Sequence, residues 1–220
     1  MRALVFDAYG TLFDVASVTS ACGTVTATPE PFVALWRAKQ LEYTFLRTLM
    51  GQYRDFWQVT ADALHYTLKR LGLTATDEQK AQLMQAWLTL QPFPEVSETL
   101  QRLSHYPRLI LSNGSLHMLN QLLENTALAS AFDAVLSVEA VRRYKPVPQV
   151  YELATRQLGC AAREVVFLSA NGFDVAGAKA FGFTVCWVNR TNLPLDELGA
   201  TPDTEIRTLA ELPNLVTTWQ

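Results

Sequence analysis

Leu4-Val5-Phe6-Asp7-Ala8-Tyr9-Gly10-Thr11-Leu12 is the stretch of sequence that decides the fold. Apolar residues fill positions 3–6 without interruption and lead directly into Asp7. Such a short run is typical of a strand buried on both faces of a parallel sheet. Asp7 then stands at the carboxyl end of that strand, where open α/β sheets bind their ligands. Taken alone, Asp7 could equally be a turn or capping acid, so the rest of the chain has to decide.

Composition excludes several classes of protein. Of the 220 residues, 49% are hydrophobic and 18% are charged, which suits one domain, or a domain with an insertion, that buries a full core. The net charge is -3 and there is no Lys/Arg-rich run, so we expect no nucleic-acid partner. We also expect no membrane span, because no apolar run approaches roughly 20 residues, and no signal peptide. Cys22, Cys160 and Cys186 lack metal-like spacing, which predicts reduced thiols in a cytoplasmic protein.

Residues 15–90 have the pattern of helices and contain no convincing strand. Helical periodicity covers residues 32–50 and 54–71, and residues 76–79 form a capping box that opens a third helix. We expect the first of these helices to turn five side chains inward, namely Leu35, Trp36, Leu41, Phe45 and Leu49. The segment is therefore predicted to be a helical insertion.

The remainder of the chain alternates between strands and helices. Short apolar runs at residues 109–111, 134–136, 165–168 and 184–188 predict strands, with helices between them and a tail that is mostly loop with a short helix. This alternation predicts an α/β fold with a mainly parallel sheet. We expect residues 1–14 and 91–220 to form this core, and residues 15–90 to form a cap over the carboxyl edge of the sheet.

Polar side chains gather where the predicted strands end. Because the carboxyl ends of parallel strands meet at one edge, these residues should share a crevice. Each has an ordinary explanation when taken alone: Asn113 could belong to a turn, Lys145 to a solvated loop, and Asp174 to a helix cap. Their occurrence together on successive strand ends favours a functional site. The set consists of Asp7, Thr11, Ser112, Asn113, Lys145, Ser169, Asn171 and Asp174.

These residues resemble the four motifs of the haloacid dehalogenase superfamily. The first motif has Asp followed by Gly-Thr-Leu after an apolar strand, as at residues 7–12, and the second has Ser or Thr after a strand, as at Ser112. The third is a Lys before Pro, here residues 145–146, and the fourth is acidic, here residues 169–174. The resemblance extends over the whole chain and implies a Rossmann-like core with an inserted cap.

Position 9 distinguishes between two branches of this superfamily. Its phosphatases carry a second Asp two positions after the nucleophile, which acts as general acid and supplies a main-chain ligand to Mg²⁺. Tyr9 stands there in this chain, and Ser169 replaces the first acid of the fourth motif. Since Mg²⁺ needs several oxygen ligands, the resemblance implies no metal and no cofactor. A metal-dependent phosphatase remains the alternative.

The chain is more specifically similar to L-2-haloacid dehalogenases. The similarity rests on residues 6–14, 36–37, 40–43, 49–50, 55–57, 111–114 and 144–146 and on Tyr151. Members of that group often have Ser-Ser-Asn-x-Trp-Asp in the fourth motif, whereas residues 169–174 here read Ser-Ala-Asn-Gly-Phe-Asp, so that Phe173 replaces a Trp in the pocket wall. The resemblance implies a homodimer, a 2-haloacid substrate and a halide product.

The same resemblance implies a role for each residue. Asp7 would be the nucleophile, with Thr11, Asn171 and Lys145 near its carboxylate and Asp174 as activator of water. Ser112 would anchor the substrate carboxylate, and Arg37 and Asn113 would hold the halide. The pocket wall would consist of Tyr9, Leu41, Phe56 and Phe173.

Alternatives remain for four of these residues. Leu41 and Phe56 fit helix core positions equally well, and Arg37 could be a surface charge beside Trp36. Tyr151 could donate a hydrogen bond to Ser169 or Asp174, or only pack against its neighbours.

Overall fold

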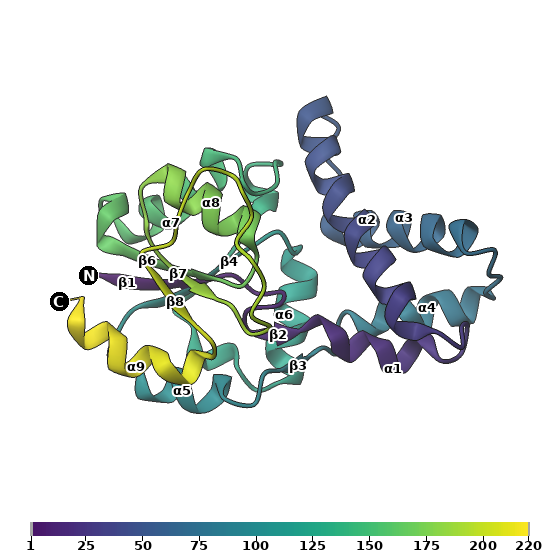
Figure 1. Ribbon diagram of the computed structural model, residues 1–220, viewed down its shortest axis with the longest axis horizontal. Coiled ribbons are helices and arrows are strands. Elements are labelled where there is room, and N and C mark those ends of the chain that lie inside the picture. Colours follow the sequence, from purple (N-terminus) through teal and green to yellow (C-terminus); the bar gives the residue numbers. More distant parts are fainter. Residues whose placement is uncertain (1, 220) are drawn as a thin grey trace.

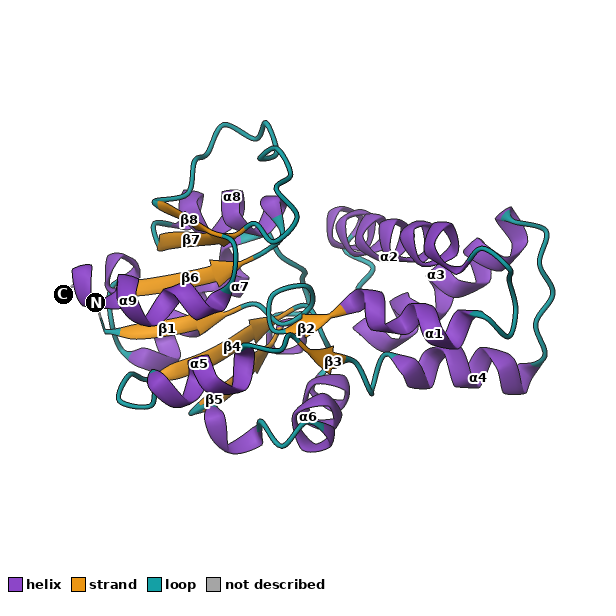
Figure 2. Ribbon diagram, turned by 60° about the horizontal axis from the view of Figure 1, so that its bottom comes forward, coloured by secondary structure: helices purple, strands orange, loops and turns teal. Residues whose placement is uncertain are grey.

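A six-stranded sheet forms the centre of the larger part of the molecule (Figures 1 and 2). The structure is a computed structural model and describes residues 2–219. Every neighbouring pair in the sheet is parallel, in the order β5-β4-β1-β6-β7-β8. The mainly parallel α/β fold predicted from the sequence is therefore confirmed. The strands are β1 (Ala3–Phe6), β4 (Arg108–Ser112), β5 (Ala134–Ser137), β6 (Val165–Ser169), β7 (Thr184–Val188) and β8 (Thr204–Ile206).

Strand β1 lies in the middle of this sheet, between β4 and β6, and all four of its residues are buried. Burial on both faces explains why its sequence is apolar without alternation. The pairing continues one residue past the strand, because the Asp7 N–H donates to the Leu168 carbonyl at 2.9 Å. Asp7 consequently emerges at the centre of the carboxyl edge of the sheet.

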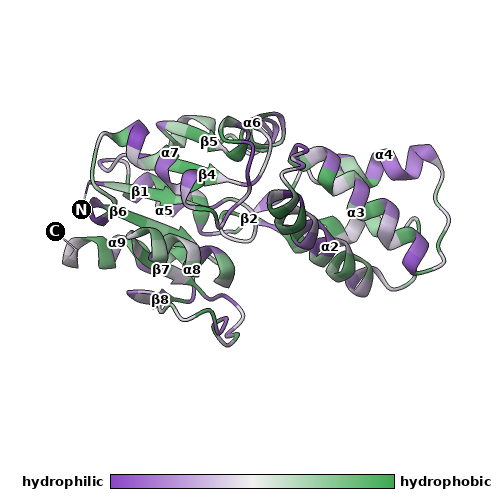
Figure 3. Cartoon of the chain, turned by 90° about the horizontal axis from the view of Figure 1, so that it is seen from above, coloured by the Kyte–Doolittle hydropathy of each residue, from purple (hydrophilic) through white to green (hydrophobic). Residues whose placement is uncertain are grey.

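Helices cover both faces of the sheet. Figure 1 shows α7 (Pro148–Leu158) and α8 (Gly172–Phe181) on one side, and α5 (Val96–Arg102) and α9 (Leu212–Leu215) on the other. Another helix, α6 (Leu116–Asn125), follows β4. Figure 3 shows β6 and β7 as apolar strands, as their burial between helical layers requires. Short 3₁₀ helices complete this part: η2 (Ala129–Ala131), η3 (Val138–Ala140), η4 (Ala162–Glu164), η5 (Leu209–Glu211) and η6 (Val216–Thr218).

A second group of helices lies beside the sheet, to the right in Figures 1 and 2. Two short antiparallel strands, β2 (Phe13–Asp14) and β3 (Gln91–Pro92), carry the chain out to this group and back. The capping box predicted at residues 76–79 is present at the start of α4. The group contains η1 (Val15–Val18), α1 (Thr19–Cys22), α2 (Pro29–Met50), α3 (Phe56–Arg70) and α4 (Asp77–Ala86). No helix within residues 2–219 has both the length and the apolar character needed to cross a bilayer.

Two expectations about these elements are wrong. On α2, Leu49 is 83% exposed, whereas the polar residues Gln40 and Thr44 are fully buried. The many apolar residues of this helix allow more than one inward face, and packing against α3 selects the face with Trp36 and Gln40. The C-terminal tail contains the edge strand β8, whose three residues are too few to show a periodic pattern.

Candidate active site

The Asp7 carboxylate receives hydrogen bonds from four side chains. Its Oδ2 accepts from Asn171 Nδ2 at 2.8 Å, from Thr11 Oγ1 at 3.1 Å and from Ser169 Oγ at 3.5 Å. Its Oδ1 accepts from Lys145 Nζ at 3.0 Å. Asp7 is only 5% exposed, so these donors replace most of its water. The residues predicted at three of the strand ends therefore meet at one carboxylate.

The turn after β1 brings Thr11 back to Asp7. Gly10 has φ of 84°, a left-handed conformation that glycine adopts without strain. The Thr11 hydroxyl also accepts a hydrogen bond from the Ala170 N–H at 2.9 Å. Since that bond uses an oxygen lone pair, the hydroxyl proton remains directed at Asp7.

Lys145 lies between two carboxylates. Its Nζ is 3.0 Å from Asp7 Oδ1 and 2.9 Å from Asp174 Oδ2, and the side chain is 1% exposed. Burial by itself would lower the pKa of Lys145, but the charges of Asp174 and Asp7 outweigh it and raise the pKa above its usual value. Lys145 is consequently an ammonium group shared by both acids.

Asp174 is fully buried on the first turn of α8. Tyr151 donates to its Oδ1 at 2.8 Å, which selects one of the alternatives left open by the sequence. Burial raises the pKa of Asp174 to about 6, with Lys145 opposing the rise and Asp7 adding to it. Gly177 makes this contact possible, because a Cβ there would lie 2.5 Å from the Tyr151 hydroxyl.

Ser112 and Asn113 follow β4 and reach the same edge. Ser112 is fully buried, and its Oγ accepts from the Gly114 N–H at 3.1 Å, leaving the hydroxyl proton for another acceptor. Asn113 Oδ1 accepts from the Lys145 N–H at 2.9 Å. This bond determines the orientation of the Asn113 amide, so that its NH₂ group is the end available to an anion.

An aromatic wall of Tyr9, Phe56 and Trp87 begins two residues after Asp7. The Tyr9 ring is 5.4 Å from that of Phe56 and 6.0 Å from that of Trp87. Among the described residues, the Tyr9 hydroxyl has no hydrogen-bond partner, and burial raises its pKa, so it is a neutral phenol. A Cβ at Gly114 would lie 2.9 Å from this hydroxyl, so the wall also packs on the loop after β4.

Arg37 reaches this wall from α2. Burial lowers the pKa of its guanidinium, and the nearby charge of Asp7 opposes that effect. Its Nη1 donates to Gln40 Oε1 at 2.5 Å. A fully solvated surface position, one of the alternatives from the sequence, does not fit these surroundings.

The remaining predicted wall residues differ in their surroundings. Phe56 is 1% exposed and contacts Tyr9, so it serves as core and as wall. Leu41 is partly buried on α2. Phe173 is partly buried, with its ring 5.1 Å from that of Phe45, and lies beside Lys145. Phe173 and Lys145 border a cavity of about 470 Å³. The cavity is also lined by Phe45, Thr48, Leu49, Tyr144, Pro146, Val147 and Pro148.

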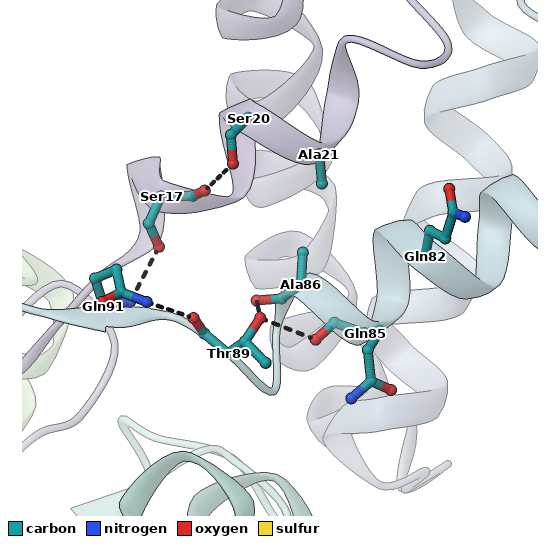
Figure 4. Close-up of a pocket in the computed structure, with 8 residues that line it drawn as sticks. All are labelled: Ser17, Ser20, Ala21, Gln82, Gln85, Ala86, Thr89 and Gln91. Atoms are coloured by element: carbon teal, nitrogen blue, oxygen red, sulfur yellow. Dashed lines mark hydrogen bonds between the residues drawn. The ribbon is translucent and has the colours of Figure 1, made fainter. Parts of the chain in front are cut away.

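A second cavity of about 470 Å³ lies at the junction of η1 and α1 with α4 and β3 (Figure 4). Ser17 Oγ accepts from the Gln91 N–H there at 3.3 Å, joining the two segments that connect the helical group to the sheet. Its lining has no titratable side chain: Ser17, Ser20, Ala21, Gln82, Gln85, Ala86, Thr89 and Gln91. The acid–base groups described above are therefore elsewhere.

Two buried polar residues near Arg37 were missed from the sequence. Gln40 and Thr60 are fully buried and hydrogen-bonded to each other at 2.6 Å. The available signal was helical spacing, because Gln40 follows the inward-facing Trp36 by four residues.

Comparisons with known proteins agree with this geometry. Residues 1–182 match the model of a family described as haloacid dehalogenase-like hydrolase. An (S)-2-haloacid dehalogenase of Pseudomonas putida is 46% identical over 215 residues, covering 96% of each chain. Another from Xanthobacter autotrophicus is 50% identical over 193 residues, covering 86% of this chain and 76% of the relative.

A solved structure of L-2-haloacid dehalogenase from Xanthobacter autotrophicus superposes with a TM-score of 0.94 at 42% identity, covering 99% of both chains. A second structure of that enzyme, with chloropropionic acid covalently bound, also has a TM-score of 0.94 at 42% identity, covering 100% of both chains. The resemblance seen in the sequence motifs is thereby confirmed. The chain belongs to the haloacid dehalogenase-like hydrolases and, among them, to the family of (S)-2-haloacid dehalogenases.

Proposed function

We propose that this chain hydrolyses (S)-2-haloacids, such as L-2-chloropropionate, and haloacetates to the corresponding hydroxyacids and halide through an ester on Asp7. For a chiral substrate the product is the (R)-2-hydroxyacid. The observation that carries the proposal is the buried Asp7 carboxylate, held by Lys145, Thr11, Asn171 and Ser169. The relative with covalently bound chloropropionic acid supports a covalent intermediate.

In the first step Asp7 displaces the halide. Oδ1 has a single donor, Lys145, whereas Oδ2 has three, so Oδ1 is the oxygen with more of its electron density free for attack. Attack on C2 forms the carbon–oxygen bond while the carbon–halogen bond breaks and its electron pair leaves with the halide. The fixed carboxylate supplies much of the rate by orientation.

In the second step water hydrolyses the ester at Cγ of Asp7. Asp174 takes a proton from the water as it attacks, and negative charge develops on Oδ2. Thr11, Asn171 and Ser169 already donate to that oxygen, as an oxyanion site requires. The bond from Cγ to the substrate oxygen then breaks, the departing oxygen takes the proton from Asp174, and a water oxygen remains on Asp7.

Substrate binding uses the groups around this carboxylate. The Ser112 hydroxyl has a proton available and would donate it to the substrate carboxylate. Arg37 and the Asn113 amide would receive the departing halide. A guanidinium suits this purpose because it is weakly hydrated and keeps its charge when partly buried. Tyr9, Phe56, Leu41 and Phe173 would enclose the apolar part of the substrate.

We propose that the reaction needs no metal or cofactor. The Asn171 amide donates both to Asp7 Oδ2 and to the main-chain oxygen of Tyr9, at 2.8 and 3.1 Å. Those are the two kinds of oxygen that hold Mg²⁺ in the phosphatases, and Lys145 occupies the space between Asp7 and Asp174. N–H donors therefore stand where a cation would need free oxygens, which disfavours the metal-dependent phosphatase.

Residues 15–90 act as a cap in this proposal, and residues 1–14 and 91–220 act as the core. The arrangement in Figure 1 supports the division, since the helical group is joined to the sheet by β2 and β3. The cap supplies Arg37, Leu41 and Phe56, while the core supplies the nucleophile and the groups around it.

We also propose a cytoplasmic homodimer. The C-terminal half of α2 exposes an apolar face, with Leu46, Leu49 and Met50 exposed by 43%, 83% and 61%. Such a contiguous face is typical of a protein interface. The three cysteines are unpaired, as expected in a reducing compartment.

Release of chloride from L-2-chloropropionate in the presence of EDTA tests the activity. We expect chloride from the L-enantiomer and none when Asp7→Asn replaces the wild type. A single turnover in ¹⁸O water should place the label in Asp7 before it enters the hydroxyacid. Folded protein that releases no chloride from either enantiomer, or release of phosphate from p-nitrophenyl phosphate that depends on Mg²⁺, would contradict the proposal.

A further inference from the structure

A chain of three hydrogen bonds runs from the Arg37 guanidinium into the helical group. Arg37 Nη1 donates to Gln40 Oε1 at 2.5 Å, and Gln40 Nε2 donates to Thr60 Oγ1 at 2.6 Å. Thr60 Oγ1 in turn donates to the Phe56 carbonyl at 2.6 Å. The chain thus ends at the main chain of the aromatic residue that packs on Tyr9.

Gln40 also joins α2 to α3 through its bond to Thr60, but packing between the two helices does not by itself require an amide at this position. It is fully buried on a helix face where an apolar side chain would cost less, since a buried amide must keep its hydrogen bonds. Its oxygen can accept only because its NH₂ group is directed at Thr60, so the amide has one orientation. One turn earlier, Trp36 Nε1 donates to the Thr60 carbonyl at 2.8 Å, which is a second hydrogen bond between α2 and α3.

The orientation of Arg37 matters because its charge has to face the departing halide. A long side chain with several free torsions loses rotamer entropy whenever it is held in one such orientation. A fixed acceptor removes that freedom before the substrate arrives. The Asp7 carboxylate is close enough for its charge to act on this guanidinium, which the bond to Gln40 anchors.

We propose that Gln40 is a positioning residue that fixes Arg37 toward the departing halide, with Thr60 holding the Gln40 amide in the required orientation. The inference rests on the dehalogenase activity proposed above. Loss of either residue should slow the step in which the carbon–halogen bond breaks. Chloride should be affected more than bromide, because its bond breaks less readily and its charge is more concentrated. Ester hydrolysis, in which no halide departs, should be unaffected.

The test uses Gln40→Met and Thr60→Val, with Thr67→Val as matched control. Thr67 lies on the same helix, is equally buried, and donates to the Ala63 carbonyl at 2.8 Å in the manner of Thr60, but has no link to Arg37. Thr60→Val also leaves the Gln40 amide without its acceptor, so it should cost more stability than Thr67→Val, and urea denaturation measures both. Thr60→Val also keeps the test valid if Gln40→Met does not fold.

Halide release is measured with enzyme in excess over L-2-chloropropionate or L-2-bromopropionate, and ester decay is followed by mass spectrometry. We expect about tenfold slower chloride release in Gln40→Met, by loss of orientation, and a smaller change in the same direction in Thr60→Val. Thr67→Val should release halide at the wild-type rate. The inference would be overturned if both test variants released halide at the rate of Thr67→Val. It would also be overturned if chloride release, bromide release and ester decay were all slowed equally. Absence of halide release from the wild type would instead refute the dehalogenase activity itself.

Discussion

Replacing Lys145 by Met should destabilise the fold in a manner that depends on pH. Lys145 is 1% exposed and forms ion pairs with Asp7 at 3.0 Å and with Asp174 at 2.9 Å. Methionine fills a similar volume without charge and leaves two carboxylates buried side by side. Removing one partner from a buried ion pair costs about 3–5 kcal/mol. We expect a loss of this size in the free energy of unfolding at pH 7.

The loss should be smaller at pH 5. In the wild type the pKa of Asp174 is raised to about 6, so Asp174 releases its proton between pH 5 and pH 7. Without the ammonium group the pKa rises further, and the native variant keeps that proton over the whole interval. A native state that binds more protons loses stability as pH rises, at about 1.4 kcal/mol for each pH unit over which one extra proton is held. The stability that Lys145→Met loses relative to the wild type should therefore be about 1.4 kcal/mol smaller at pH 5 than at pH 7.

Urea denaturation at both pH values measures this difference, and a variant that folds at pH 5 but not at pH 7 would agree with it. Lys179→Met is the control, because the Lys179–Asp203 pair at 2.6 Å is about one-third exposed on both sides. Its effect should remain below about 1 kcal/mol. Equal losses for Lys145→Met at the two pH values would show that packing, and not the charge of Lys145, is what the fold requires.

Three further results are expected. Asp7→Asn removes a charge that adds to the raised pKa of Asp174, so ¹³C NMR should find that pKa below about 6, and an unchanged value would contradict the coupling. Arg190→Met removes the 2.9 Å bond from its Nη2 to the Thr11 carbonyl and the ion pair with Glu95, so it should cost about 1–3 kcal/mol of stability and lower turnover. A variant that is destabilised in urea but turns over at the full rate would show that Arg190 serves only the fold. Leu49→Glu places a charge on the exposed face of the proposed homodimer and should convert it to monomers in sedimentation, and a wild type that sediments as a monomer would refute the proposed dimer.

The central strands of the sheet were predictable because they are buried on both faces and therefore have largely unbroken apolar sequences. Val165 to Leu168 shows this clearly, and β6 covers those residues. Leu49 shows the opposite case. The α2 sequence has apolar residues around much of its circumference, so helical periodicity alone does not decide which of them face inward. Contacts with α3, the next helix of the chain, bury Gln40 and leave Leu49 exposed.

The grouping of the polar residues at the strand ends followed from topology alone. Parallel strands deliver Asp7, Ser112 and Asn171 to one edge whatever their detailed conformation. The sequence left undecided whether Tyr151 bonds to Asp174, because this hydrogen bond depends on the close approach of α7 and α8 that Gly177 permits. The acceptor for Arg37 was missed altogether, since a glutamine on a helix is more often exposed than buried.

The sharing of Lys145 connects the two proposed chemical steps. Before the first step the ammonium group is divided between two anions, and burial together with Asp7 raises the pKa of Asp174 to about 6. Formation of the ester removes the charge of Asp7, so Lys145 then faces Asp174 alone. An undivided opposite charge lowers the pKa of a carboxyl group, so in this proposal Asp174 stays ionised down to a lower pH while a water molecule is being activated. In the proposed mechanism, alkylation of Asp7 therefore leaves Asp174 as the charged partner of Lys145 when water hydrolyses the resulting ester.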